Sequence, residues 1–106
     1  MELSFLSRLF EGSKEEQKIR TIPGKPVGKF RVESVLRVFT RQVLIGEVTE
    51  GIVYPGCKLR GGSIGKVVKI EMGRRQVDLA ESGNKVAIML ENEIPAKKGD
   101  ELEIYP

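Results

Sequence analysis

The pattern Arg37-x-Phe39-x-Arg41 places two cations and an aromatic ring at alternating positions of the chain. Alternate residues of a β-strand share a face, so we expect these three side chains to point the same way. Two guanidinium groups can bind phosphates while the ring stacks on a base, which is the chemistry of single-stranded nucleic acid binding. The alternative is that Phe39 packs beneath the N-terminal segment and that both arginines are only solvated.

Basic residues are concentrated in the middle of the sequence. The chain of 106 residues has a net charge of +3, and residues 21–75 hold eleven basic against four acidic side chains. Residues 76–106 hold three basic and seven acidic side chains. A predicted turn at Gly73-Arg74-Arg75 adds two cations at a loop tip. This distribution favours an anionic partner such as nucleic acid, although a solvated mixed surface on a heat-stable protein also fits it.

Residues suited to catalysis or metal binding are scarce. The sequence has no His and only one thiol, Cys57, which excludes His-based acid–base chemistry, His-ligated metals, disulfides and Cys zinc clusters. We expect Cys57 to be a small core or turn residue. The acidic pairs Glu91/Glu93 and Glu101/Glu103 alternate as on a solvated strand face. We therefore expect no enzymatic activity, no metal and no cofactor.

The segment from Gly61 to Lys66 is similar to a phosphate-binding loop. However, three residues rather than four separate Gly61 from Gly65, and Val67 follows Lys66 where Ser or Thr would hold magnesium. We therefore expect no nucleoside triphosphate to bind there.

The sequence carries no targeting or membrane signal. A single Cys fits a reducing compartment. No apolar run approaches the roughly 20 residues that a bilayer requires. The start at Met1-Glu2 lacks a basic leader and a small-residue cleavage site. We expect a cytoplasmic protein that does not contact membranes.

Residues 1–20 have the apolar spacing of a short amphipathic helix, which Gly12 can end. The apolar stripe of this helix consists of Leu3, Leu6, Leu9 and Phe10. The stripe either folds back to close one end of the core, or docks onto a partner protein or a second copy. Residues 21–28 contain two prolines and two glycines, which predicts a linker.

Residues 29–106 have the pattern of short strands separated by Gly and Pro turns. In the first strand, Lys29 to Arg41, we expect Phe30, Val32, Leu36 and Val38 to point inward. The other predicted strands are Val43 to Thr49, Ile52 to Tyr54, Cys57 to Arg60, Ile64 to Met72, Gln76 to Leu79, Val86 to Leu90 and Leu102 to Tyr105. Many short strands around one small core predict an all-β fold, a closed six- or seven-stranded antiparallel barrel with residues 86–90 as its most buried strand.

Several glycines precede an apolar residue by two or three positions. The pattern is Gly46-x-Val48-x-x-Gly51-x-Val53-x-x-Gly56-x-x-Leu59, then Gly65-x-Val67-x-x-Ile70, then Val77-x-x-Ala80-x-x-Gly83-x-x-Val86. This pattern resembles the second-domain β-barrel of translational GTPases such as elongation factor Tu, and the similar barrel of initiation factor two and its archaeal and eukaryotic counterpart. The resemblance covers about Phe30 to Tyr105, without a GTPase domain.

In that family the barrel holds the 3′-terminal adenosine and the aminoacyl group of charged tRNA. The family's pocket strand, Val-Glu-Met-Phe-Arg-Lys, corresponds here to Ile70-Glu71-Met72-Gly73-Arg74-Arg75. The resemblance assigns Glu71 to the acid beside the adenosine and Arg74 to the following basic residue. Gly73 stands where the family has Phe, and Lys85 stands where it has the Asn that contacts the aminoacyl group.

The sequence thus predicts a stand-alone, non-catalytic RNA-binding module that engages tRNA or ribosomal RNA. We expect Phe39 to stack on a base and Glu71 to be the pocket acid. Positive charge is assigned to Arg37, Arg41, Lys69, Arg74, Arg75 and Lys85. The alternative hypothesis is a protein-interaction barrel, an adaptor that docks or self-associates through the helix of residues 1–20.

Overall fold

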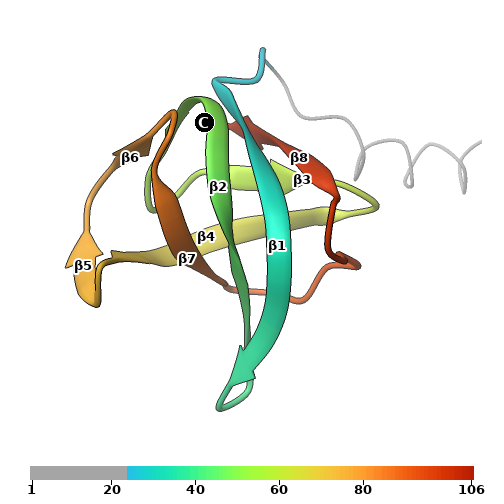
Figure 1. Ribbon diagram of the computed structural model, residues 1–106. Helices are drawn as coiled ribbons and strands as arrows, with labels where there is room; N and C mark the ends of the chain where they lie inside the picture. Colours follow the sequence, from blue (N-terminus) through green and yellow to red (C-terminus); the bar gives the residue numbers. More distant parts are fainter. Residues whose placement is uncertain (1–23) are drawn as a thin grey trace, which may run out of the picture.

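The computed structural model describes residues 24–106 (Figure 1). The predicted helix with Leu3, Leu6, Leu9 and Phe10 lies outside the described residues, as does the first part of the predicted linker. The chain from Gly24 to Val27 forms no strand, and the first strand begins at Gly28. Within residues 24–106, no helix is long and apolar enough to cross a membrane.

Strands form all the regular structure of the described chain. Three strands are long: β1 (Gly28–Val38), β2 (Arg41–Val53) and β4 (Ile64–Met72). The shorter ones are β3 (Lys58–Arg60), β5 (Arg75–Val77), β6 (Ala80–Glu81), β7 (Lys85–Leu90) and β8 (Glu101–Tyr105).

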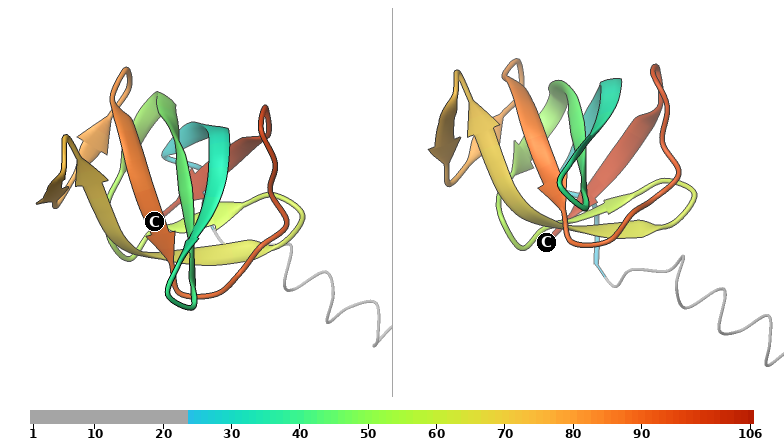
Figure 2. Two further views of the ribbon diagram at one scale, coloured as in Figure 1. Left: turned by 60° about the horizontal axis from the view of Figure 1, so that its bottom comes forward. Right: turned by 90° about the horizontal axis from the view of Figure 1, so that it is seen from below.

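The strands close into a barrel, which the right-hand view of Figure 2 shows from below. The order of hydrogen-bonded neighbours is β1, β8, β3, β4, β7 and β2, and β2 pairs with β1 to complete the ring. Every pairing is antiparallel; outside the ring, β5 pairs with the end of β4, and β6 pairs with the end of β2. The predicted all-β, closed antiparallel barrel is confirmed, with six strands in the ring.

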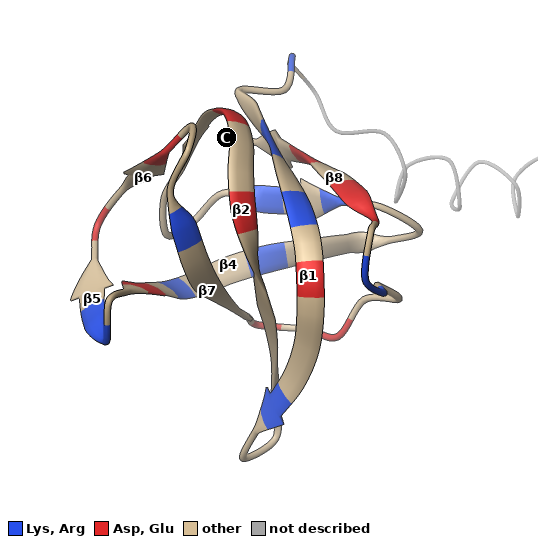
Figure 3. Cartoon of the chain, in the orientation of Figure 1, with Lys and Arg blue, Asp and Glu red and all other residues tan. Residues whose placement is uncertain are grey.

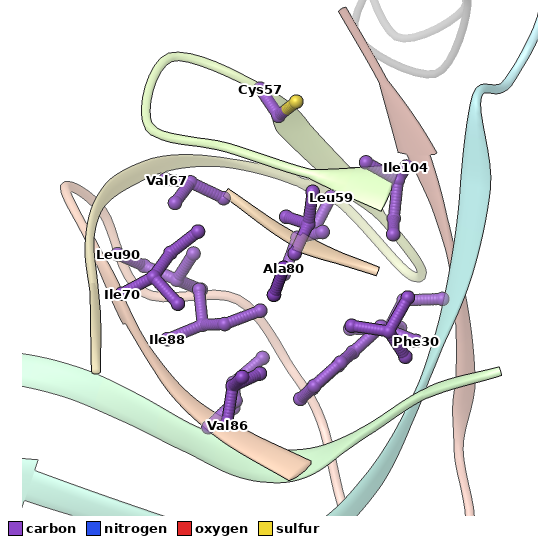
Figure 4. Packing of buried hydrophobic residues seen from close by; sticks show 14 of the residues in the cluster. Phe30, Cys57, Leu59, Val67, Ile70, Ala80, Val86, Ile88, Leu90 and Ile104 are labelled. Carbon is purple, nitrogen blue, oxygen red and sulfur yellow. The ribbon is translucent and has the colours of Figure 1, made fainter. Parts of the chain in front are cut away.

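The interior of the barrel is a single apolar cluster (Figure 4). Every second residue along the strands points into this cluster, and the side chains of Phe30, Leu44, Leu59 and Ile88 are fully buried. Burial of each such side chain contributes about 1.5–3 kcal/mol. Cys57 belongs to the same cluster, so the structure agrees with its predicted role as a small core residue.

Strand β1 contains a bulge that changes which side its residues face. Val32 lies opposite Gly46 on β2, and Ser34 lies opposite Ile45, so Glu33 is an extra residue in β1. An extra residue moves every later side chain of a strand to the other face. The alternation that begins at the start of β1 is therefore reversed beyond the bulge.

This reversal corrects the prediction for β1. Phe30 and Val32 point into the core as expected, with at most 1% of either side chain exposed. Leu36 and Val38 were expected to join them, but they lie on the outer face and are 47% and 39% exposed. The sequence pattern cannot show the bulge, because nothing at Glu33 distinguishes it from an ordinary outward strand residue.

The predicted strand from Lys29 to Arg41 is also too long. It ends at Val38, and Phe39 and Thr40 form a tight turn into β2, where Arg41 is the first residue. Phe39 has a φ of 58°, in the left-handed region that bulky residues rarely adopt. No Gly, Asn, Asp or Pro marks this turn, so its position was not predictable from turn residues.

Further differences concern the later strands. The predicted strands Val43 to Thr49 and Ile52 to Tyr54 are one strand, β2, because Gly51 absorbs the irregularity with a φ of 68°. The predicted strand Gln76 to Leu79 is the shorter β5, and β6 was not predicted. The run 86–90 is not buried on both faces, since buried and half-buried residues alternate along it.

Candidate nucleic-acid interface

A hollow of about 460 Å³ lies on the outside of the barrel wall, next to the free end of the β1–β2 hairpin. We call it the outer hollow. It is lined by Leu36, Val38, Phe39, Val43, Ile45, Lys69, Glu71, Ala87 and Met89. Its volume lies within the range of about 300–1,000 Å³ that is usual for ligand sites. Seven of its nine lining residues are apolar, which is unusual for the solvent side of a small barrel.

Four neighbouring strands build the outer hollow in two rows. Directly paired residues of antiparallel strands share a face. Leu36 of β1 pairs with Val43 of β2, Val43 pairs with Met89 of β7, and Met89 pairs with Lys69 of β4. In the adjacent row the paired residues are Ser34, Ile45, Ala87 and Glu71. Each row therefore changes from apolar or neutral residues to a charged residue at β4.

The two charged residues at β4 contact each other. The Lys69 Nζ and a Glu71 carboxylate oxygen are 3.7 Å apart, and both side chains are partly exposed. A surface ion pair of this kind contributes about 0–1 kcal/mol, so either partner can exchange it for a ligand group at little cost. Glu71 is thus held at the edge of the outer hollow, with a carboxylate that can accept hydrogen bonds.

Phe39 stands at the end of the outer hollow, in the turn of the hairpin. Its side chain is 93% exposed, which is the highest value among the large apolar residues described. The alternative prediction placed Phe39 beneath the N-terminal segment. Residues 1–23 lie outside the described part of the chain, and no residue of 24–106 buries the Phe39 ring. The left-handed backbone costs a bulky residue stability, and a ring that is 93% exposed gains little from burial.

The structure corrects the expectation that Arg37, Phe39 and Arg41 share one strand face. Arg41 pairs with Val38, so it lies on the outer face beside the outer hollow. Arg37 pairs with Gln42, whose side chain is buried, so Arg37 lies on the opposite face of the hairpin. The two arginine side chains therefore lie on opposite faces of the hairpin, next to the turn that carries Phe39.

The two arginines also differ in their partners. Arg37 forms an ion pair with Glu93, and both side chains are more than half exposed. Arg41 has no ion pair with any residue of the described part of the chain. Its charge is therefore available for an anion near Phe39.

The remaining predicted cations are not among the residues that line the outer hollow, and Figure 3 shows basic segments spread over several elements. Arg74 occupies the β4–β5 turn with a φ of 68°. Arg75 pairs with Met72, so it lies on the side of β4 opposite to Glu71. Lys85 is on the outward face of β7, where it forms a 3.7 Å ion pair with Glu33.

Six apolar residues of the outer hollow were not predicted as site residues: Leu36, Val38, Val43, Ile45, Ala87 and Met89. The outward positions of β7 carried a usable signal. A strand of an antiparallel barrel usually alternates apolar and polar residues, whereas Ala87 and Met89 are apolar between the core residues Val86, Ile88 and Leu90. An all-apolar strand in such a barrel indicates an outer surface that is covered by something else.

The structure also gives the surroundings of Cys57 and of the segment from Gly61 to Lys66, the other features considered for chemistry. Burial raises the pKa of the Cys57 thiol, which keeps it protonated and unreactive at neutral pH. The segment from Gly61 to Lys66 lies in the β3–β4 hairpin rather than between a strand and a helix, which is the context that a phosphate-binding loop needs. Among residues 24–106, no three His, Cys, Asp or Glu side chains are grouped as a metal site would require.

The comparisons with known proteins agree with the barrel. The family profile described as "Elongation factor Tu domain 4" matches residues 25–103. The chain belongs to this family. It is a translation-factor β-barrel, and its 106 residues include no GTPase domain. No curated protein sequence matches the chain.

Two solved structures contain similar barrels. The first is GDP-bound aIF5B from Aeropyrum pernix, with a TM-score of 0.68, 23% identity, and coverage of 98% of this chain and 19% of that protein. The second is a bacterial selenocysteine-specific elongation factor, EF-Sec, with a TM-score of 0.66, 25% identity, and coverage of 94% and 18%. The chain therefore spans about a fifth of the length of either protein.

Proposed function

We propose that this barrel is a non-catalytic RNA-binding module that holds an unpaired nucleotide of tRNA or ribosomal RNA in the outer hollow. The observation that carries the proposal is the placement of an exposed aromatic ring, Phe39, at the end of an apolar hollow on a barrel of the translation-factor family. Base stacking on aromatic side chains is the common means by which proteins bind unpaired nucleotides.

The proposal gives each part of the outer hollow a role. The base lies against the apolar residues of β2 and β7, with one face on Phe39. Glu71, which matches the pocket acid of the resembling family, accepts a hydrogen bond from a ribose hydroxyl or a base amino group. Lys69 and Arg41 lie on two sides of the site and attract the phosphates.

The cations outside the outer hollow have a secondary role in this proposal. Arg74 and Arg75, at the end of β4, extend the positive charge beyond Glu71. Arg37 and Lys85 are each paired with a carboxylate, so each contributes a smaller share of the phosphate attraction. Their contribution is electrostatic and independent of sequence, so it decreases as salt rises.

A titration tests the proposal. Fluorescence anisotropy measures the affinity of the chain for tRNA, and for the same tRNA without its unpaired 3′ end, at several salt concentrations. We expect the trimmed tRNA to bind more weakly. We expect Phe39→Ala to lower the affinity for intact tRNA about 5- to 150-fold, which corresponds to the loss of about 1–3 kcal/mol of stacking.

Two variants serve as controls. Phe39→Trp keeps a ring for stacking and should retain the affinity. Leu79→Ala removes another exposed apolar side chain, one outside the outer hollow, and should leave the affinity unchanged. Equal binding of heparin and tRNA, or an affinity that Phe39→Ala does not alter, contradicts the proposal.

A further inference from the structure

The aromatic ring at the tip of the β1–β2 hairpin is more exposed than stacking on a single base requires. The side chain of Phe39 is 93% exposed, so both faces of its ring are open to solvent. One face suffices for a base held in the outer hollow. The other face has no covering residue within the described chain.

Charge is distributed on both sides of this ring. Arg41 lies on the outer face of the hairpin with Val38, and Arg37 lies on the opposite face with Gln42. One guanidinium group therefore stands on each side of the ribbon, next to the turn that carries Phe39. A ligand that used only the outer hollow would meet Arg41 alone.

The backbone conformation of the turn also singles out Phe39. Phe39 adopts a φ of 58°, a conformation in which Gly would be unstrained and a bulky residue is disfavoured by about 1–2 kcal/mol. Strain of this kind persists where a side chain is needed in that position. The left-handed residue projects the ring beyond the last strand pair, Val38 and Arg41, rather than onto the sheet.

We infer that the hairpin tip is a wedge that inserts the Phe39 ring between two consecutive bases of a single RNA strand. This inference rests on the proposed function and extends it from one bound nucleotide to a dinucleotide step. One base stacks on the inner face of the ring in the outer hollow, and the adjoining base stacks on the other face. Arg41 and Arg37 then bind the phosphates on the two sides of the ring, which requires a strand that passes over the tip.

The ion pair between Arg37 and Glu93 is compatible with this arrangement. Glu93 holds the Arg37 side chain on its face of the hairpin, while about half of that side chain stays exposed. A guanidinium group has five donors, so it can bind a carboxylate and a phosphate at the same time. Glu93 therefore positions Arg37 in this proposal.

The experiment uses a property of the composition. The full chain contains no Trp, so Phe39→Trp introduces a single fluorescent reporter at the tip. Adenosine monophosphate, the dinucleotide ApA and the tetranucleotide of adenosine are titrated against this variant. We expect the dinucleotide to bind at least tenfold more tightly than the mononucleotide and to quench the Trp fluorescence further, because a second stacked base adds about 1–3 kcal/mol.

The arginines supply the second measurement. With the tetranucleotide and the unsubstituted chain, Arg37→Gln and Arg41→Gln should each reduce the slope of log affinity against log salt by about 0.7, the value for one phosphate of a single strand. Arg60→Gln removes the same charge on the other side of the barrel and should not change the slope. Glu93→Gln should weaken binding less than Arg37→Gln does.

The outcomes separate the wedge from the proposed function. If the tetranucleotide binds and depends on Phe39, but ApA and the mononucleotide bind equally or only Arg41 affects the slope, then the ring stacks on one side and the wedge is wrong. If the unsubstituted chain binds neither tRNA nor the tetranucleotide, both proposals are wrong. Tighter binding of ApA, together with equal slopes for both arginine variants, supports the wedge.

Discussion

Two walls of the same barrel expose opposite kinds of surface. Across β1, β8 and β3, the outward residues Lys29, Glu103 and Arg60 lie directly opposite one another, so charges alternate from strand to strand. Across β1, β2 and β7, the corresponding outward row is Leu36, Val43 and Met89. The architecture and the inward alternation are the same on both walls. Only the residues on the outer face differ.

This difference supports placing the proposed site on the wall with the outer hollow. The Arg60 guanidinium lies 3.2 Å from a Glu103 carboxylate oxygen, so charges on the β3–β8 wall satisfy one another and form an ordinary solvated surface. The wall with the outer hollow exposes apolar side chains. Beside them lie the exposed ring of Phe39 and Arg41, which has no ion pair with the described residues. A contiguous patch of exposed apolar surface on a small protein is often a binding site.

The largest effect should come from making the apolar wall resemble the charged one. Met89→Glu places a carboxylate in the floor of the outer hollow, where it repels phosphate and cannot support a base. We expect the affinity for tRNA to fall more than tenfold, with the far-ultraviolet circular dichroism spectrum unchanged.

The matched control for Met89→Glu is a larger charge change on the other wall. Lys58→Glu alters the net charge by two units, against one for Met89→Glu, and lies on β3. If affinity followed net charge alone, Lys58→Glu would weaken binding more. We expect it to weaken binding less, and the reverse order would show that the two walls are equivalent.

A smaller effect should appear in stability at the hairpin tip. Phe39→Gly removes the left-handed strain of a bulky residue, whereas Phe39→Ala keeps it. We expect the Gly variant to be about 1 kcal/mol more stable than the Ala variant, or about 4–8 °C in melting temperature. Both variants should bind RNA weakly. Equal melting temperatures by calorimetry would show that the tip is not strained.

The smallest effect should come from the charged wall. Arg60→Ala breaks a partly exposed ion pair with Glu103, which is worth about 0–1 kcal/mol. We expect a loss of stability below about 1 kcal/mol in urea unfolding and no change in the affinity for tRNA. A clear loss of affinity would mean that RNA also contacts this wall.

The barrel was predictable from sequence because glycines mark its turns and apolar residues alternate along most of its strands. Gly56, Gly83 and Gly99 all adopt positive φ at predicted turns. The bulge at Glu33 was not predictable, because a bulge is set by how β1 must bend against β2 and not by a residue type. The single extra residue was enough to misplace Leu36 and Val38.

The candidate site was only partly predictable from the sequence. Glu71 and Lys69 were predicted, and they line the outer hollow. The shared face of Arg37 and Arg41 was wrong, because the turn at Phe39 and Thr40 separates them onto two strands. The apolar floor was missed because apolar strand residues are normally assigned to the core. Ala87 and Met89 can be placed outside only once Val86, Ile88 and Leu90 are known to fill the inside.

The position of β8 has a consequence for how the chain is made. This last strand lies between β1 and β3, so it joins segments from the beginning and the middle of the described sequence. During synthesis, the flanking edges of β1 and β3 remain without this neighbour until β8 has left the ribosomal exit tunnel. Closure of the ring is therefore a late and slow event, since pairing of strands distant in sequence carries a high entropic barrier. Unfinished chains present an open sheet edge, the form most prone to aggregation.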